Sequence, residues 1–599
     1  MTDAPHPAEP HTHSVRVTAP DLQRRAALET TRGRLVIAAG GFGVLFLAVV
    51  VKLASATVLF PMMPKRERAA RLPDPAAEVQ GAEPSTPAAP RTRAIITDRN
   101  GEILAISLPT AGLYANPREM IDTGEAALKL KSVLPQLDLE LVRTRLAADK
   151  QFVYLARNIT PREQLAVNNL GIPGVYFEQT ERRRYPQGRV AAHVVGSVDV
   201  DAVGVAGAER AFNDRLRQDG TPLRLSIDVR VQAVVRDELM KAMTEFRAIG
   251  ACGIVMDVRT GEVVAMVSLP DFDANKPGVG RQEERFNRAV TGMYEPGSTF
   301  KLQTAAMSLD TGAGRLWNSY DAANNIKIGR FTIQDYQGKR RWLSFPEVIA
   351  YSSNLGAAHM AQAVGAERQR SWLQAMGMFT RVGIELPEQG QPIVQPAANW
   401  KDVTTLTVGF GHGIAVSPLH VVRGTAALAN GGTVLRPTIL AGDGAPQEGM
   451  RVMQQSTSDT MRKLMRLVVT DGYGKPADVP GYFVGGKTGT AEKTAARGYK
   501  RNANISAFMS VFPMNAPRYA VYFMLDEPKG NASTGGYSTA GAVSAPGAGR
   551  VISRIGPMLG LMPDTNPAAA QASLAMGMHP GRPASAPVRP VAATSVAAR

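Results

Sequence analysis

A long uncharged run near the N-terminus places the strongest limit on how this chain can fold. Residues 35–51 read LVIAAGGFGVLFLAVVV, without a charged side chain. The apolar stretch continues to Phe60 if Lys52 extends its amine towards the lipid headgroups. About 20 apolar helical residues are enough to span the hydrocarbon core of a bilayer. We therefore predict a single transmembrane helix over residues 35–60.

The alternative for this run is a cleaved signal peptide. Ala54-Ser55-Ala56 resembles the small-residue pattern at which signal peptides are cut. The apolar part of a signal peptide is only about 7–15 residues long, and this run is longer, which favours an uncleaved anchor. Arginines and lysines flank the run on both sides, so charge alone does not decide which side of the membrane holds the rest of the chain.

The composition is that of a globular protein with a basic surface. The 599 residues are 44% hydrophobic and carry a net charge of +16, which favours anionic surfaces such as membrane headgroups. The basic residues are not interleaved with aromatic residues, so we expect no nucleic acid binding. Cys252 is the one cysteine, which excludes an internal disulfide, and its apolar surroundings predict a buried strand. The histidines, His412 among them, are isolated and expected to be structural; we predict no metal site and no cofactor.

Changes in composition divide the chain into five further segments. Polar residues 1–34 and low-complexity residues 561–599 are predicted to be disordered tails. Residues 61–90, rich in proline and alanine, are predicted to be a linker. Between them we predict two folded modules, residues 91–225 and residues 226–560.

The second module has strand-like segments at both of its ends. CGIVMDV and EVVAMVSL lie early and read as a hairpin, whereas YFVGGKTGT, SAFMSVFP and YAVYFMLD lie late. The segments between them have helical patterns. This order predicts a mixed α/β fold with one antiparallel sheet flanked by helices.

The first chemical motif is YEPGSTFK at residues 294–301. After Pro296-Gly297, the pattern predicts a helix that begins near Ser298. Residues three apart share a helix face, so the hydroxyl of Ser298 and the amine of Lys301 can meet. A single S-x-x-K is weak evidence by itself, because the same spacing is common on solvated helix surfaces.

Two further motifs follow in order and change that assessment. Ser352 and Asn354 stand at the head of a second apolar helix, where an N-cap would be the ordinary interpretation. Lys487, Thr488, Gly489 and Thr490 stand at the end of a strand. The order S-x-x-K, S-x-N, K-T-G is typical of serine enzymes that react with penicillin, in which the middle motif is often S-D-N.

A phosphate-binding loop is the main alternative for the third motif. Residues 481–488, GYFVGGKT, formally fit the pattern G-x-x-x-x-G-K-[ST]. That pattern requires a loop between a strand and a helix, whereas Tyr482-Phe483-Val484 reads as strand. The sequence therefore argues against nucleotide binding at this position.

With these motifs, the chain resembles the class B penicillin-binding proteins, and in particular the division-type, FtsI-like peptidoglycan D,D-transpeptidases. EPGSTFK, YSSNLGAA and GGKTGTAEK resemble the three active-site motifs of that family. RAIITDRNGEILA and GVAGAERAFNDRL resemble segments of its N-terminal pedestal module. The resemblance implies a pedestal (dimerisation-like) module over 91–225 and a penicillin-binding transpeptidase domain over 226–560.

The resemblance also implies roles for the motif residues. Ser298 would be the nucleophile, with Lys301 as its base, and Ser352 would pass the proton to the departing D-alanine. Asn354 would hold a substrate amide, and Lys487 would supply positive potential. Thr488, Gly489 and Thr490 would bind substrate. The two threonines would bind its terminal carboxylate. Backbone N–H groups of Ser298 and Thr490 would form an oxyanion hole.

Partners and location follow from the same resemblance. The implied ligands are peptidoglycan stem peptides and β-lactam antibiotics, and the implied protein partners are those of a division complex, including a glycosyltransferase. The catalytic module would lie in the periplasm, anchored in the inner membrane at the division septum. An elongation-type transpeptidase and a non-catalytic scaffold stay open as alternatives, and a β-lactamase is the nearest rival enzyme.

Overall fold

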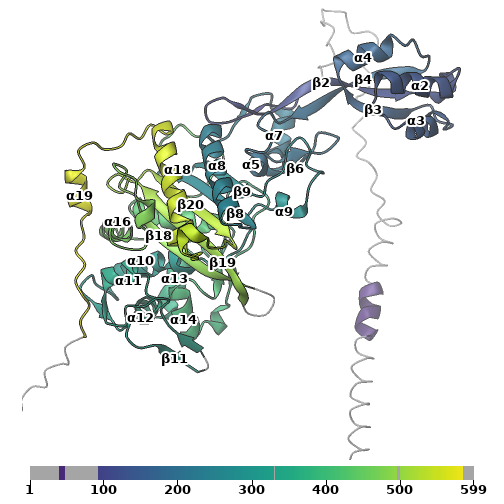
Figure 1. The fold of residues 1–599 in the computed structure, drawn as a ribbon. Coiled ribbons are helices and arrows are strands. Elements are labelled where there is room, and N and C mark those ends of the chain that lie inside the picture. Colours follow the sequence, from purple (N-terminus) through teal and green to yellow (C-terminus); the bar gives the residue numbers. More distant parts are fainter. Residues whose placement is uncertain (1–38, 48–91, 330, 495–498, 584–599) are drawn as a thin grey trace, which may run out of the picture. The chain divides into compact units, whose positions relative to one another are not determined.

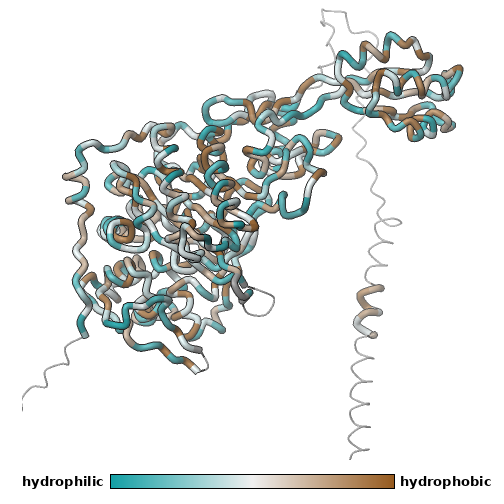
Figure 2. Tube along the Cα trace, in the orientation of Figure 1, coloured by the Kyte–Doolittle hydropathy of each residue, from teal (hydrophilic) through white to brown (hydrophobic). Residues whose placement is uncertain are grey.

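The computed structural model describes residues 39–47, 92–329, 331–494 and 499–583 (Figure 1). By compactness the chain divides into residues Met1–Ala88 and Ala89–Arg599. Residues 39–47 are helical and mostly hydrophobic (Figure 2). Within the described ranges, no helix has the length and apolar character needed to cross a membrane. The predicted tail 1–34, most of the predicted anchor 35–60 and the predicted linker 61–90 lie outside these ranges.

The N-terminal module contains a five-stranded sheet with strand order β3-β2-β1-β7, in which β4 also pairs with β2. Helices α2, α3 and α4 cover one face of its distal part, where Leu113, Leu130 and Leu146 form a separate apolar core. The elements of this module are β1 Ile96–Thr97, β2 Ile103–Ala115, η2 Pro117–Glu119, α2 Thr123–Val133, α3 Leu139–Leu146, β3 Val153–Ile159, α4 Pro161–Asn168, β4 Val175–Arg184, α5 Ala192–Val195, β5 Ser197–Val198, β6 Gly204–Ala206, α6 Gly207–Ala211, α7 Asn213–Gln218 and β7 Leu223–Arg224.

The base of this module is held by a buried ionic cluster. Glu209 is completely buried, and its two carboxylate oxygens accept 2.7 Å hydrogen bonds from Arg93 Nε and Arg183 Nε. Buried charges require such pairing, because desolvation of an isolated carboxylate is very costly. Apolar residues of the base, such as Tyr185 and Val194, belong to the same core cluster as the second module. The apolar core is therefore continuous across residues 225 and 226. The domain boundary at this position stays a prediction.

The second module is built on one antiparallel sheet, as predicted, and its strand order is β18-β19-β20-β8-β9. The strands β8 Gly250–Asp257 and β20 Tyr519–Asp526 are buried at every residue, which explains their continuous apolar sequences. Cys252 lies in β8 as a buried core residue, and burial raises the pKa of its thiol to about 12. The remaining strands of the sheet are β9 Val263–Leu269, β18 Gly485–Thr494 and β19 Tyr499–Phe512.

Helices cover both faces of this sheet (Figure 1). On one face, α8 Val229–Glu245 and α18 Ala545–Met558 bury residues such as Leu239 and Ile552 against β8 and β20. On the other face lie α10 Lys301–Asp310, α15 Pro418–Ala429 and α16 Gln455–Thr470. The mixed α/β fold with a flanked antiparallel sheet is thereby confirmed.

A helical lobe with short two-stranded ladders surrounds α10. Its elements, together with the other short ones of the module, are α9 Gln282–Arg285, η3 Gly297–Phe300, β10 Ser319–Tyr320, β11 Ile326–Ile328, β12 Phe331–Ile333, β13 Leu343–Ser344, α11 Phe345–Ala350, α12 Asn354–Val364, α13 Ala366–Ala375, β14 Ile393–Val394, η4 Ala397–Asn399, α14 Asp402–Gly409, β15 Ile414–Ala415, β16 Thr433–Val434, β17 Met450–Arg451, η5 Lys475–Ala477, η6 Ala532–Thr534 and α17 Ala540–Val543.

The C-terminal segment differs from the expected disordered tail 561–599. Residues 561–583 have defined positions and include a further helix, α19 Ala568–Leu574. Leu574 is only 7% exposed and joins the core cluster that contains Phe345 and Met461. The low-complexity composition misled the prediction, because a few apolar residues are enough to anchor a segment to an existing core. Residues 584–599 lie outside the described ranges.

Candidate active site

The turn that carries Ser298 is enclosed by glycine contacts on two sides. Gly297 has φ +52°, and its N–H donates to the carbonyl of Gly411 at 3.1 Å. A Cβ on Gly411 would lie 2.1 Å from Gly297 O, and one on Gly297 would lie 3.2 Å from Thr490 O. No side chain fits at Gly411 without a shift of the backbone, and at Gly297 the positive φ adds strain to a tight contact, so glycine is favoured at both positions. The chain then continues as the 3₁₀ turn η3, from Gly297 to Phe300, and the α-helix α10 begins only at Lys301. The helix predicted to begin near Ser298 therefore starts as a 3₁₀ turn that contains Ser298.

Lys301 lies at the centre of the motif residues and is fully buried. Its Nζ lies 3.0 Å from Ser298 Oγ and 3.2 Å from Ser352 Oγ. It also donates to Ser352 O at 2.5 Å and to Asn354 Oδ1 at 2.7 Å. Burial lowers the pKa of Lys301 to about 7, against the opposing effect of the Asp335 carboxylate. An amine with this pKa is available as a base at neutral pH.

Ser352 connects the two lysines of the site. Lys487, which is also fully buried, donates from Nζ to Ser352 Oγ at 2.8 Å. Burial, and then the charge of Lys301, lowers the pKa of Lys487 well below its usual value. Ser352 adopts φ +57°, a conformation that residues with a Cβ rarely adopt. Such local strain is held by the surrounding structure and is common at functional sites.

Asp335 is a site residue for which no sequence motif gave a signal. Its carboxylate accepts from Ser353 Oγ at 2.7 Å, from the Asn354 N–H, and from the Leu355 N–H at 3.0 Å. These contacts place a negative charge at the N-terminus of α12, which is favourable for the helix dipole. The carbonyl of Gln334, one residue earlier, accepts from Asn354 Nδ2 at 3.0 Å. The 334–335 loop therefore fixes the position of the S-x-N motif.

The K-T-G residues lie on β18, which is the edge strand of the main sheet. β18 pairs with β19 on one side, and η3 lies next to it. A Cβ on Gly489 would meet Thr299 Cγ2 at 2.6 Å, so glycine allows the strand to pass close over the turn that carries Ser298. Thr490 Oγ1 accepts from the Ala540 N–H at 3.0 Å. Tyr482-Phe483-Val484, expected to be strand, are irregular and precede β18, which begins at Gly485. The phosphate-loop alternative for 481–488 is wrong for another reason: Lys487 lies within a strand, not ahead of a helix, and contacts Ser352.

The structure therefore brings the residues of all three motifs together. Hydrogen-bond distances connect Ser298, Lys301, Ser352, Asn354 and Lys487 to one another, and Lys487 Nζ also contacts Thr488 Oγ1 at 3.3 Å. The resemblance to the family implied that the motifs meet, but their spacing could not show it, because the three motifs lie far apart in the chain.

Two more residues at the site were missed. Glu295, three residues before Ser298, accepts from the Gly413 N–H at 2.9 Å and lies 3.9 Å from His412 Nδ1. Burial, and then the charge of Lys301, lowers the pKa of His412 to about 4. This histidine, expected to be isolated, therefore belongs to the surroundings of the site.

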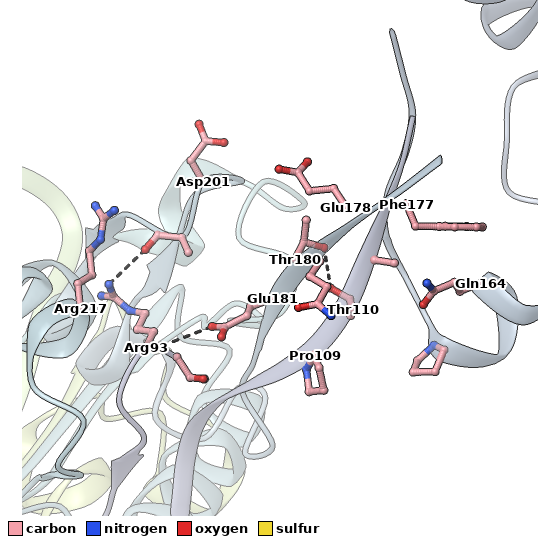
Figure 3. Close-up of a pocket in the computed structure, with 15 residues that line it drawn as sticks. Arg93, Pro109, Thr110, Gln164, Phe177, Glu178, Thr180, Glu181, Asp201 and Arg217 are labelled. Carbon is pink, nitrogen blue, oxygen red and sulfur yellow. Dashed lines mark hydrogen bonds between the residues drawn. The ribbon is translucent and has the colours of Figure 1, made fainter. Parts of the chain in front are cut away.

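A separate hollow of about 820 Å³ lies in the N-terminal module and contains none of the motif residues (Figure 3). Thr110 and Thr180 share a 3.1 Å hydrogen bond beside it, and the Arg93 N–H donates to Glu181 at 3.4 Å. The guanidinium of Arg93 is already paired with Glu209. We therefore place the candidate active site at Ser298, Lys301, Ser352 and Lys487, and not in this hollow.

The comparisons with known proteins agree with this placement. The family model described as Penicillin binding protein transpeptidase domain matches residues 251–549, and the one described as Penicillin-binding Protein dimerisation domain matches residues 88–221. The chain is 43% identical over 484 residues to a protein of Caulobacter vibrioides named Probable peptidoglycan D,D-transpeptidase FtsI, covering 78% of this chain and 82% of that one. This chain belongs to the FtsI-like class B penicillin-binding proteins.

Other relatives of this FtsI-like chain are more distant. Peptidoglycan D,D-transpeptidase FtsI of Escherichia coli K12 is 30% identical over 505 residues, which cover 79% of this chain and 84% of the relative. Probable peptidoglycan D,D-transpeptidase PenA of Neisseria gonorrhoeae is 32% identical over 482 residues, or 75% and 82% of the two chains. The crystal structure of a peptidoglycan synthetase from Bifidobacterium adolescentis shares the fold, with a TM-score of 0.63 at 22% identity over 79% of this chain and 96% of that one.

Proposed function

We propose that this FtsI-like protein is a peptidoglycan D,D-transpeptidase that crosslinks stem peptides through an acyl-enzyme on Ser298. One observation carries the assignment of residues. The buried amine of Lys301 lies 3.0 Å from Ser298 Oγ and is held in place by Ser352 and Asn354. A serine hydroxyl is a weak nucleophile until a neighbouring base takes its proton, and Lys301 is placed to do so.

The first step is attack of Ser298 Oγ on the carbonyl between the last two D-alanines of a donor peptide. Neutral Lys301 accepts the hydroxyl proton as the new ester bond forms. Negative charge then develops on the carbonyl oxygen, where the backbone N–H groups of Ser298 and Thr490 donate to it. Such a donor contributes about 3–4 kcal/mol to the stabilisation of the transition state.

Ser352 completes the step by moving the proton to the leaving group. Its Oγ lies 3.2 Å from Lys301 Nζ and 2.8 Å from Lys487 Nζ, so a proton can pass from Lys301 through Ser352 to the departing amine. The C–N bond breaks and D-alanine leaves as a neutral amine. Thr488 and Thr490 bind its carboxylate, and Lys487 supplies positive potential.

The donor peptide lies along the outer edge of β18. An edge strand offers unpaired backbone groups to an extended peptide, which can add to the sheet as a further strand. Asn354, held by Gln334, contacts an amide of this peptide from the opposite side. An amine of a neighbouring stem peptide then attacks the ester, Ser298 is released, and the crosslink forms.

We predict that acylation accelerates as pH rises through about 7. The pKa of Lys301 is lowered to about 7, so the amine is protonated below this pH and neutral above it. Only the neutral form accepts the Ser298 proton, so the rate should fall about tenfold per pH unit below the pKa. Second-order rate constants for a fluorescent penicillin between pH 5 and pH 9 would test this. A flat profile across pH 6–8 would contradict the role of Lys301 as base.

We also predict that the penicilloyl adduct on Ser298 persists for many minutes. A class A β-lactamase hydrolyses its adduct with a glutamate-activated water, and the chain has no E-x-x-L-N segment between Asn354 and Lys487. The glutamates of VGIELPEQG are used elsewhere: Glu385 accepts from Thr438 Oγ1 at 2.8 Å, and Glu388 accepts from the Gly207 N–H at 2.8 Å.

Intact-protein mass spectrometry after a penicillin pulse measures the adduct directly. A stable mass increase supports a transpeptidase. Loss of the adduct within seconds, with catalytic accumulation of penicilloate, would identify a β-lactamase.

The membrane topology belongs to the same proposal. The apolar run 35–60 is an uncleaved anchor, the tail 1–34 is cytoplasmic, and the catalytic module lies in the periplasm at the division septum. The substrate supports this, because peptidoglycan lies outside the cytoplasmic membrane. The partners are division-complex proteins, including a glycosyltransferase. A mature N-terminus at Thr57, found by mass spectrometry of the purified protein, would contradict the anchor.

The decisive experiment for the function combines an assay with a phenotype. Purified full-length protein, with polymerised peptidoglycan that bears pentapeptide stems, should release D-alanine and form crosslinked dimers, and Ser298→Ala should form none. Depletion in cells should block septation and leave lateral growth intact. Rounded cells would instead indicate an elongation-type enzyme, and normal septation restored by Ser298→Ala would indicate a scaffold.

A further inference from the structure

The chain beyond α18 crosses the helical lobe of the catalytic module. In Figure 1 this yellow segment runs from α18 past α16 towards α11. α19 lies against α16 and anchors the segment through Leu574, which is buried in the main core. Met576 also packs against that core. The path therefore ends beside the helix that leads into the S-x-N motif.

The segment docks through its backbone at Gly581. A Cβ at this position would lie 2.4 Å from Leu343 C and 2.6 Å from Ser344 N, so the fit against β13 requires glycine. The Gly581 N–H donates to Glu347 Oε2 at 3.0 Å. The next N–H, that of Arg582, donates to Ser319 Oγ at 3.1 Å on β10. The contact is therefore specific in position, in contrast to a loosely apposed tail.

Glu347 links this docking point to helix α11. It is 3% exposed and forms the capping box of α11 with Ser344, whose N–H donates to Oε2 at 3.0 Å. Arg341 Nη1 donates to the same oxygen at 3.0 Å. Burial alone would raise the pKa of Glu347, but the hydrogen bonds from Arg341, Ser344 and Gly581 lower it overall. Gly581 is thus one of the groups that hold the ionised carboxylate in place.

Helix α11 in turn carries the loop that contains Ser352. The Ser352 N–H donates to Ile349 O at 3.3 Å, and the Ser353 N–H donates to Val348 O at 3.0 Å. Both acceptors belong to α11, which is only six residues long, from Phe345 to Ala350. A shift of this short helix must therefore move Ser352, which has φ +57° and little freedom to compensate.

We propose that residues 575–583 form a C-terminal strap whose docking at Gly581 positions Ser352 through Glu347 and helix α11. The strap touches neither substrate nor reacting atoms, so Gly581 is a positioning residue. This inference rests on the proposed function of Ser352 as the proton relay to the leaving group.

The test uses the full-length protein and a matched pair of substitutions within the strap. Gly581→Ala forces a methyl group into the Leu343 backbone. Gly577→Ala is the control, because its Cβ would meet nothing closer than His579 Nε2 at 3.5 Å. Fluorescent penicillin then gives two quantities for each protein: the fraction that labels at saturation, and the rate constant of that labelling.

We expect Gly581→Ala to label to the wild-type extent but about tenfold more slowly, because small displacements of a catalytic group have large effects on rate. Gly577→Ala should behave as wild type. A lower labelled fraction with an unchanged rate constant would show that the strap only stabilises the fold and would overturn the proposal. An unchanged rate and extent in Gly581→Ala would also overturn it.

Two further variants keep the test decisive if Gly581→Ala misfolds. Deletion of residues 577–599 removes the Gly581 hydrogen bond without adding bulk, whereas deletion of 584–599 keeps the strap. We expect slower labelling only in the longer deletion, and equal rates in both would overturn the proposal.

A double-mutant cycle tests the route from the strap to the helix. The effects of Gly581→Ala and Glu347→Gln should be non-additive if they share one path. Additive effects would overturn the route through Glu347. If wild-type protein itself fails to label, the proposed function fails, and the strap is not implicated.

Discussion

Replacing Ser298 by alanine should abolish penicillin labelling and D-alanine release completely. The acyl group would form on the Oγ of Ser298, and alanine has no side-chain oxygen to replace it. The protein should still fold, because the substitution removes one hydroxyl whose hydrogen bond to Lys301 contributes only about 1 kcal/mol. Gel fluorescence after labelling and a thermal melt of the same sample measure both quantities.

For Ser298→Ala, the extent of labelling must be compared with the thermal stability of the same sample. A folded Ser298→Ala protein without label supports the nucleophile assignment. A folded variant that labels normally would require a different nucleophile. Cys252 is a poor candidate for that different nucleophile, because it is buried in β8 and burial raises the pKa of its thiol to about 12.

Replacing Lys301 by alanine should slow acylation by about 10²–10⁴-fold, the usual contribution of a general base. Its amine contacts Ser298, Ser352 and Asn354, so the loss removes both the base and the group that holds the site together. Stopped-flow or manual-quench labelling at pH 8 gives the rate constant. At this pH most of the wild-type Lys301 is neutral, so the comparison is made where the base is available.

Lys493→Ala is the matched control on β18. Lys493 is the last residue of GGKTGTAEK, but it forms ion pairs with Asp526 at 2.8 Å and Glu527 at 3.1 Å, and among the described residues no hydrogen bond joins it to Ser298, Lys301, Ser352, Asn354 or Lys487. Asp526 and Glu527 are buried, so the loss of Lys493 should lower stability, although Arg288 and Lys500 still face these carboxylates. The rate constant of acylation in the folded protein should stay within about twofold of wild type, because Lys493 contacts neither the serines nor the lysines of the site. A loss in Lys493→Ala as large as in Lys301→Ala would mean that positive charge near β18, and not a base at Lys301, controls the rate.

The sequence predicted those parts of the molecule that depend on local pattern. Continuous apolar runs identified β8 and β20, and Pro296-Gly297 identified the turn that leads into α10, although the first residues of that turn are 3₁₀ rather than α-helical. The motifs named the lysines and Ser352. The order of the three motifs in the chain was the evidence that they belong to one site. Their spacing alone could not show that Lys487 meets Ser352.

The parts that escaped prediction depend on contacts between distant segments. Asp335 belongs to no motif, and its role follows only from the folding of its loop onto the N-terminus of α12. His412 was expected to be isolated, because Glu295 is far from it in sequence. The C-terminal segment was expected to be disordered, because its composition does not show that Leu574 fits an existing core.

The stacked glycines around Ser298 restrict how this protein could become resistant to β-lactams by mutation. Resistance through target alteration requires a changed site that still accepts the natural peptide. A Cβ at Gly411 or Gly489 would lie 2.1 Å or 2.6 Å from the nearest atom, and at Gly297 it would lie 3.1 Å from Ala491 Cβ on a backbone with φ +52°. Substitutions at these three positions should therefore disturb the Ser298 turn itself, so that selection for resistance is expected to act on side chains further from Ser298.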